Sequence, residues 1–140
     1  MQIALANPTH IFEVVHFFNV NLDRKNSAVF SDEFFCPLGI KAAIRRKQMI
    51  VATVEGQVVG AFRFYRKKTQ NKISLYQFAI SEVYRGQGLL KKMLNTINDL
   101  PIVALCPTDS NFNEYYYKSG WKLQEQSDVF KIWVFSNEGR

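Results

Sequence analysis

The stretch FAISEVYRGQGLLKKML, residues 78–94, decides how the rest of the sequence is interpreted. An apolar run gives way to a turn that holds Gly86 and Gly88, and an apolar helical pattern begins at Leu89. A helix that begins after such a turn leaves its first four amide N–H groups without intrahelical partners, at the positive end of its dipole. Glycine lets the backbone approach a phosphate closely and adopts positive φ at little cost. We therefore predict an anion-binding turn.

Three cations flank this turn and can add positive charge at its rim, namely Arg85, Lys91 and Lys92. The turn lacks the GxxxxGK[ST] pattern of a P-loop. It also lacks the third glycine and the downstream acidic residue of a dinucleotide-binding turn. Taken alone, the stretch is equally consistent with an ordinary turn and helix cap carrying solvated lysines.

The composition is that of an ordinary globular protein and predicts one domain over residues 1–140. The chain is 47% apolar and 21% charged, without an internal repeat or a Pro/Gly/Ser-rich linker. It has no secretory signal pattern and no apolar run of roughly 20 residues, so we expect a cytoplasmic protein.

Cys36 and Cys106 lack CxxC spacing, which favours reduced packing residues and predicts no metal site. The net charge of +6 favours an anionic ligand or partner.

Hydrophobic periodicity predicts a mixed α/β sheet with flanking helices. Asn7 and Pro8 are a typical helix start, Gly56 is typical of a hairpin turn, and Pro101 and Gly120 are typical of helix ends. The stretch from Asn19 to Pro37 fits no element with certainty. The predicted elements are a strand at 2–6, helices at 7–18 and 38–47, a hairpin at 49–65, a strand at 71–81, a helix at 88–100, a strand at 102–106, a helix at 110–120, and strands at 121–126 and 129–135.

Two motifs resemble the GCN5-related N-acetyltransferase (GNAT) family. That family carries Arg/Gln-x-x-Gly-x-Gly/Ala between its fourth strand and third helix, and residues 85–90 read Arg-Gly-Gln-Gly-Leu-Leu, with Leu90 at the last small position. FNEYYYKSGW, residues 112–121, is similar to the family's fYeklGF ending and places its tyrosine at Tyr116. The predicted order of elements also follows the family order through the whole chain.

The resemblance implies a GNAT-like fold, a mostly antiparallel sheet in which the fourth and fifth strands form a splayed parallel pair. It implies acetyl-CoA as donor and coenzyme A as product, with the pantetheine arm along the fourth strand and the pyrophosphate on the glycine turn. The cofactor-binding residues that it implies are Phe78, Ala79, Ile80, Arg85, Gly86, Gln87, Gly88, Leu89, Leu90 and Lys91.

The family's chemistry implies one catalytic side chain, the phenol of Tyr116, which donates a proton to the departing thiolate. Many family members carry a glutamate base on the fourth or fifth strand, but the matching positions here hold Ser74 and Ala104. Glu33, His10 and His16 are alternatives in regions that the pattern does not place. We therefore name no base and expect deprotonation through water or of an amine whose pKa is already low. Asp109 is expected either to contact pantetheine or to cap the fourth helix.

The acceptor is not identified by the sequence. FRFYRKKTQNK, residues 62–72, and RRK, residues 45–47, are basic, and a solvated surface competes with recognition of an acidic metabolite, an acidic protein tail or an aminoacylated RNA. We expect an acetyl-CoA-dependent N-acetyltransferase of a primary amine on a small molecule, peptide or protein, acting as a monomer or homodimer. One alternative is a nucleic-acid-binding domain in which Phe62, Phe64 and Tyr65 stack bases. Another is a non-catalytic acyl-CoA sensor on the same fold.

Overall fold

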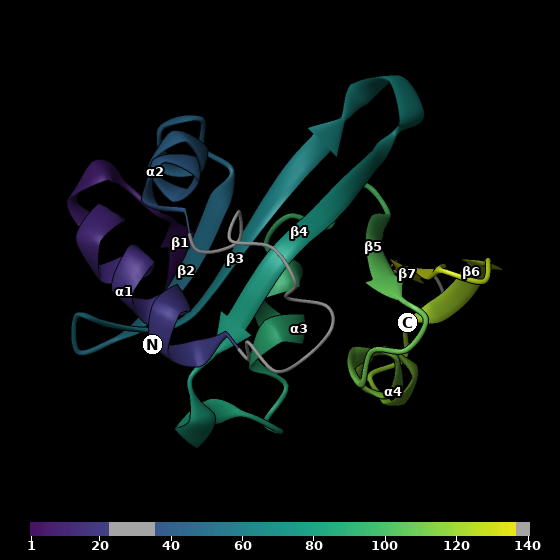
Figure 1. Cartoon of the computed structure of the whole chain (residues 1–140). Helices are drawn as coiled ribbons and strands as arrows, with labels where there is room; N and C mark the ends of the chain where they lie inside the picture. Colours follow the sequence, from purple (N-terminus) through teal and green to yellow (C-terminus); the bar gives the residue numbers. More distant parts are fainter. Residues whose placement is uncertain (23–35, 137–140) are drawn as a thin grey trace. The chain divides into compact units, whose positions relative to one another are not determined.

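The computed structural model describes residues 1–22 and 36–136, and its elements follow the predicted order (Figure 1). Each predicted strand and helix is present, with shifts of a few residues at the ends. The elements are β1 (Gln2–Leu5), the short 3-10 helix η1 (Pro8–His10), α1 (Ile11–Asn21), α2 (Pro37–Arg45), β2 (Met49–Val54), β3 (Gln57–Lys67), η3 (Lys68–Gln70), β4 (Lys72–Ile80), η4 (Glu82–Tyr84), α3 (Leu89–Leu94), β5 (Ile102–Pro107), α4 (Phe112–Lys118), β6 (Lys122–Gln126) and β7 (Phe130–Phe135).

The strands hydrogen-bond in the order β1-β2-β3-β4-β5-β7-β6, which gives one mixed seven-stranded sheet. The pairs β1–β2, β2–β3, β5–β7 and β6–β7 are antiparallel. β4 and β5 are parallel and pair over Ile73–Leu75 and Ile102–Ala104, although β4 continues to Ile80 and β5 to Pro107. The predicted fold class, including its parallel pair, is confirmed.

The chain divides into two compact units. Among the described residues, the first unit consists of 1–22, 36–64 and 77–97, and the second consists of 65–76 and 98–136. β3 and β4 each contribute residues to both units.

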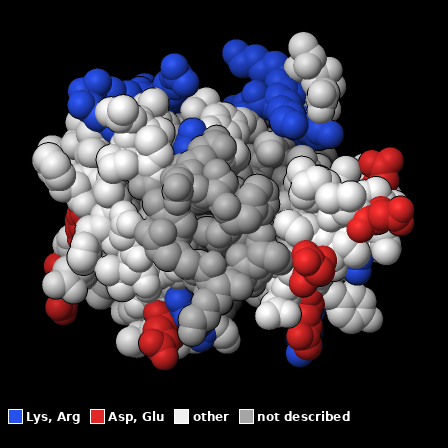
Figure 2. All heavy atoms as spheres, in the orientation of Figure 1, with Lys and Arg blue, Asp and Glu red and all other residues white. Residues whose placement is uncertain are grey.

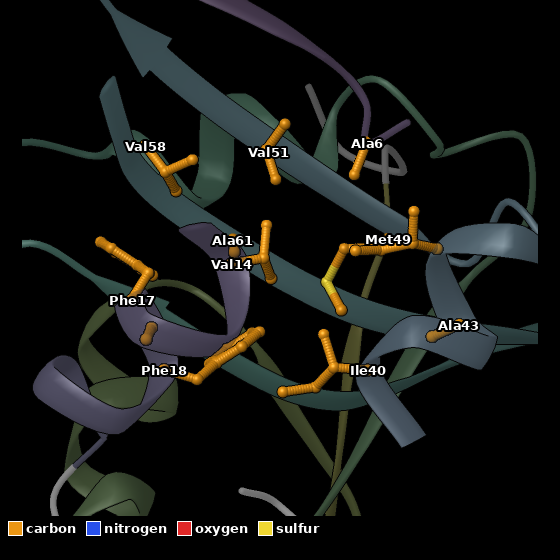
Figure 3. Close-up of a cluster of buried hydrophobic side chains, with 12 residues drawn as sticks. Ala6, Val14, Phe17, Phe18, Ile40, Ala43, Met49, Val51, Val58 and Ala61 are labelled. Atoms are coloured by element: carbon orange, nitrogen blue, oxygen red, sulfur yellow. The ribbon is translucent and has the colours of Figure 1, made fainter. Parts of the chain in front are cut away.

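In the first unit, α1 and α2 bury their apolar sides against one face of β2 and β3 (Figure 3). The helical spacing of apolar residues in α1 therefore marks its core face, as predicted. The cluster comprises Ala6, Val14, Phe17, Phe18, Ile40, Ala43, Ile44, Met49, Val51, Val58, Ala61 and Ala79.

A β-bulge in β3 lets Val58 and Ala61 share that face although they are three residues apart. The register passes from Ala52 opposite Gly60 to Thr53 opposite Val58, so β3 carries one extra residue at this point. The N–H of Val58 donates to the Glu13 carboxylate of α1, with N and Oε2 2.9 Å apart. The bulge is thus hydrogen-bonded to the helix that covers it.

Alternate residues of a strand point to opposite faces of the sheet. Gly60, next to Ala61, therefore belongs to the other face of β3, which α3 covers. A Cβ placed on Gly60 would lie 3.0 Å from Sδ of Met93 and 3.4 Å from a methyl carbon of Leu89. Glycine at position 60 therefore permits the close approach of α3. The predicted helix extended to Leu100, but α3 ends at Leu94.

The early end of α3 has a local cause in the polar residues that follow it. The amide of Thr96 bonds the carbonyl of Met93, and its hydroxyl donates to that same carbonyl at 2.7 Å. Threonine hydroxyls compete in this way with the regular helical pattern. The spacing of apolar residues overestimated the length of this helix, because it contains no information about competition from a threonine hydroxyl.

In the second unit, α4 packs on one face of the β5–β7–β6 strands. Trp133 lies directly opposite Ala104 in the β5–β7 register, and Asn113 and Tyr116 are the buried residues of α4. Cys106 is buried as a free thiol, and Cys36 in the first unit is also free and half-buried. The prediction of unbridged cysteines is therefore confirmed.

Candidate functional site

The glycine turn before α3 has the backbone that the sequence predicted. Gly86 and Gly88 both have φ of +76°, and Gly88 is the N-cap of α3. A Cβ added to either glycine would meet no atom within 4 Å, so positive φ, and not crowding, is what requires glycine here. The space beside the α-carbons of these two glycines is therefore open.

The side chains around this turn separate into buried and exposed sets. Leu89 and Leu90 are 5% and 3% exposed, so both belong to the core of the first unit. The side chain at the family's last small position therefore points into the protein. Gln87 and Lys91 are exposed. Around the turn, the side chains anchor α3 on one side and leave polar groups on the other.

Arg85 makes two hydrogen bonds to backbone carbonyls. Its Nε donates to the carbonyl of Ile80 at 2.9 Å, and its Nη2 donates to the carbonyl of Asn21 at 3.3 Å. The sequence suggested a cation at the rim of the turn, whereas these bonds connect the end of β4 to the end of α1. Gln87 donates to the carbonyl of Val83 at 2.8 Å and so stabilises the same turn. Lys91 and Lys92 are exposed and flank α3.

The end of β4 presents its predicted residues on two different edges. The N–H of Ser81 donates to the carbonyl of Val59 in β3 at 2.9 Å. Because backbone groups alternate between edges along a strand, Ala79 directs its N–H and C=O toward β3, while Phe78 and Ile80 direct theirs away from it. Of these three residues, Phe78 and Ile80 thus have the orientation that an added extended ligand requires.

Tyr116, the predicted catalytic residue, lies in the second unit within a group of aromatic rings. Its ring is 4.9 Å from that of Trp121 in an edge-on contact and 6.0 Å from that of Trp133 in a stacked one, measured between centroids. The side chain is 6% exposed. Burial raises the pKa of its phenol, and nearby Cys106 and Tyr115 act in the same direction. The hydroxyl group therefore retains its proton at neutral pH.

Asn113, one helical turn before Tyr116, is a buried polar residue that the sequence analysis missed. It is 8% exposed and bonds both the β5–α4 turn and the indole of Trp133. The sequence did contain a signal for Asn113, namely a polar residue three positions before the tyrosine and on the same face of the helix.

None of the alternative bases is assembled into a site by the described residues. His10 accepts a hydrogen bond at Nδ1 from the backbone N–H of Asn7 at 3.0 Å, which is a capping interaction, and His16 is exposed. Glu33 lies outside the described residues. Ser74 and Ala104 stand in the β4–β5 pair, as predicted.

Asp109 is exposed in the β5–α4 turn, and the N-cap residue of α4 is Asn111. The suggestion that Asp109 caps this helix is therefore wrong. Within residues 1–22 and 36–136, no group of three or more His, Cys, Asp or Glu side chains could hold a metal ion. In the same ranges, no helix is both long enough and apolar enough to cross a membrane.

Exposed cations gather at the end of α2 and, separately, at the β3–β4 turn (Figure 2). Arg63, predicted with the latter group, is instead 9% exposed. Phe62 and Phe64 are 0% and 3% exposed. The suggested base-stacking surface is therefore wrong, because two of its three rings belong to the core.

Comparisons with known proteins agree with this geometry. The acetyltransferase (GNAT) domain model matches residues 20–135. No curated protein matches the sequence.

Several solved structures share the fold over nearly the whole chain. PaiA N-acetyltransferase from Thermoplasma acidophilum, in complex with coenzyme A, is 13% identical and aligns over 96% of this chain and 98% of that chain with a TM-score of 0.76. A GNAT-family acetyltransferase from Listeria monocytogenes is 17% identical, with a TM-score of 0.76 over 96% and 93% of the two chains. YncA, a putative acetyltransferase from Salmonella typhimurium with acetyl-CoA, is 14% identical, with a TM-score of 0.73 over 100% and 95%. At these identities the likeness shows the fold alone.

Proposed function

The chain belongs to the GNAT family of acetyltransferases, and on that premise we propose that it transfers an acetyl group from acetyl-CoA directly to a primary amine. The observation that carries the proposal is the pair of positive-φ glycines, Gly86 and Gly88, at the start of α3, with open space where each would carry a Cβ. Such a turn suits a diphosphate because it offers amide donors without a Cβ above them. Structures with this fold have been solved with coenzyme A and with acetyl-CoA, which supports this donor.

Acetyl-CoA fits the residues present on two counts. The amides of residues 86–91 would hold its pyrophosphate, with Lys91 adding charge, and the outward-facing backbone groups of Phe78 and Ile80 would hold its pantetheine arm. The carbonyl of Ile80 already accepts a bond from Arg85, which fixes the end of the strand that would carry that arm. The role of Arg85 in this proposal is thus to position the backbone.

When bound, acetyl-CoA supplies an activated carbonyl and a thiolate leaving group. Tyr116 would act as the proton donor to that leaving group, since a phenol carries its proton at neutral pH. An N–H of Phe78–Ile80 would polarise the carbonyl. No base residue is part of the proposal, and the amine would lose its proton to water or enter already neutral.

The remaining predictions from the sequence also belong to the proposal. Residues 1–140 would form one N-acetyltransferase domain, located in the cytoplasm and acting as a monomer or homodimer. The acceptor would be a small-molecule, peptide or protein amine, and an acidic or aminoacylated nucleic acid would be bound only as a substrate.

The activity is tested by measuring coenzyme A release from acetyl-CoA with a panel of amines, polyamines, amino acids and peptides. We expect release that depends on at least one amine. Saturable acetyl-CoA binding without release by any amine would instead support the non-catalytic sensor.

The donor site is tested with an isosteric pair, Gly88→Asp and Gly88→Asn. Both residues tolerate positive φ better than other side chains, so the two variants differ mainly in one negative charge. We expect Gly88→Asp to weaken acetyl-CoA binding, measured by calorimetry, at least about tenfold more than Gly88→Asn, because a carboxylate in the turn repels a diphosphate. Equal affinities would place the phosphates elsewhere.

A further inference from the structure

Asn113 connects α4 to the turn that precedes it. Its side-chain nitrogen Nδ2 lies 2.8, 3.2 and 3.0 Å from the carbonyl oxygens of Pro107, Thr108 and Ser110, and it donates to all three. Two amide hydrogens thus serve three carbonyls, two of which also accept backbone N–H groups, from Ser110 and from Asn113 itself. This side chain therefore adds to the backbone bonds that hold the start of α4 against the end of β5.

The other end of the Asn113 amide faces β7. Its Oδ1 accepts a hydrogen bond from Nε1 of Trp133 at 2.9 Å, and both side chains are buried. An indole N–H can only donate, so the amide has one possible orientation, with oxygen toward Trp133 and nitrogen toward the turn. The indole ring is therefore fixed by a bond at its edge as well as by packing.

Trp133 in turn fixes Tyr116. The two rings are stacked with an interplanar angle of 24°, while Trp121 meets the other ring edge at 68°. A phenol held between one stacked and one edge-on indole has little freedom to rotate, since each contact favours one ring geometry. The orientation of the Tyr116 hydroxyl thus depends on where Asn113 holds Trp133.

We propose that Asn113 and Trp133 are positioning residues, which orient the hydroxyl of Tyr116 for proton donation. This inference rests on the proposed function, because it assumes that Tyr116 donates to the leaving thiolate. Precise placement of a reacting group accounts for a large part of enzymatic rate enhancement, and a small misplacement is costly.

The test is a double-mutant cycle with Trp133→Phe and Tyr116→Phe, assayed with the amine that supports coenzyme A release. Trp133→Phe retains an aromatic ring beside Tyr116 but removes the N–H that bonds Asn113. We expect kcat to fall about tenfold in Trp133→Phe while KM for acetyl-CoA stays within about twofold. In the Tyr116→Phe background, Trp133→Phe should lower kcat by less than about twofold, because the hydroxyl that it orients is absent.

Ile102→Val is the matched control, since Ile102 is fully buried in β5 of the same unit and has no polar group. It should cost some stability and leave kcat unchanged. Equal losses from Trp133→Phe in both backgrounds, or a loss of kcat in Ile102→Val as large as that in Trp133→Phe, would overturn the positioning role. If Tyr116→Phe retains full kcat, Tyr116 is not the proton donor, and the positioning role of Asn113 and Trp133 is then contradicted as well.

Asn113→Ser provides a second route if Trp133→Phe does not fold. The shorter serine side chain removes the amide oxygen that accepts the bond from Trp133. The same pattern is expected, with a lowered kcat in the native background and no further loss beside Tyr116→Phe. Additive losses would again assign Asn113 to stability alone.

Discussion

At the scale of single residues, Tyr116 shows how burial controls the protonation state of a side chain. The phenol is almost inaccessible and lies among Tyr115, Trp121 and Trp133. Charging it there is unfavourable, so burial raises its pKa, and burial likewise raises the pKa of the Cys106 thiol. Both groups are therefore held in their neutral, protonated forms.

The raised pKa of Tyr116 has a consequence for stability at high pH. The folded state holds the proton of Tyr116 more tightly than the unfolded chain does. The stability that this phenol contributes is therefore fully present below its unfolded pKa of about 10, and it is lost as pH rises above that value. The loss is at most about 1.4 kcal/mol per pH unit for one group. We expect the free energy of unfolding, measured with urea between pH 8 and 11, to fall less steeply above pH 10 in Tyr116→Phe than in the native chain.

Tyr117→Phe is the control for that measurement, because Tyr117 lies on the same helix and is 75% exposed. Its unfolding free energy should fall with pH as in the native chain. Parallel curves for Tyr116→Phe and the native chain would show that the Tyr116 phenol titrates alike in the folded and unfolded states.

At the scale of secondary-structure elements, the contact between α1 and the β3 bulge links helix placement to strand register. The N–H of Val58 lies beside the bulge and donates to the Glu13 carboxylate. Val58 is 8% exposed, so an unbonded N–H at this point would be largely removed from water.

Two substitutions of Glu13 separate this hydrogen bond from packing. Glu13→Gln retains an oxygen acceptor, whereas Glu13→Ala leaves the Val58 N–H without it. We expect Glu13→Ala to lower the free energy of unfolding by about 1–3 kcal/mol, and Glu13→Gln to lower it by clearly less. Urea denaturation at neutral pH measures both. Equal losses would mean that the carboxylate contributes through packing or charge instead.

The elements also show what the sequence could and could not predict. Capping and breaking residues such as Asn7, Pro101 and Gly120, with apolar periodicity, were enough for the order of elements, whereas the parallel pair was implied by the resemblance to the GNAT family. The bulge in β3 and the early end of α3 were not predictable, because one depends on a carboxylate from another element and the other on competition from Thr96. The glycine turn was predictable because positive φ leaves a direct signature in the choice of residue. The bonds made by Arg85 and Asn113 were not, because their partners are backbone carbonyls that only the fold brings close.

At the scale of the whole molecule, positive charge exceeds negative charge, with a formal net charge of +6. Arg66 forms a salt bridge with Asp99, and Lys118 forms one with Glu114. Arg66 bonds Asp99 at 2.7 Å and lowers the pKa of that carboxyl, but both side chains are well exposed, so solvent screening keeps the contribution small. Several other cations, among them Arg45, Arg46, Lys67 and Lys68, are exposed at the surface.

This charge distribution predicts how the chain behaves toward nucleic acid. With Phe62 and Phe64 in the core, these two rings cannot stack on bases, and binding to an oligonucleotide would depend mainly on cations. We expect such binding to be weak and to be lost between about 50 and 200 mM salt, as for purely electrostatic contacts. Fluorescence anisotropy with a labelled single strand measures it. Tight binding that persists at 200 mM salt would favour a nucleic-acid-binding protein over the proposed enzyme.

The bond between Trp133 and Asn113 also gives the protein an internal reporter. Because the indole proton of Trp133 is buried and bonded at 2.9 Å, it can exchange with deuterium only when this part of the protein opens. In heavy water its nuclear magnetic resonance signal should therefore persist, and the rate at which that signal fades gives the opening free energy around Tyr116 without any label or substitution.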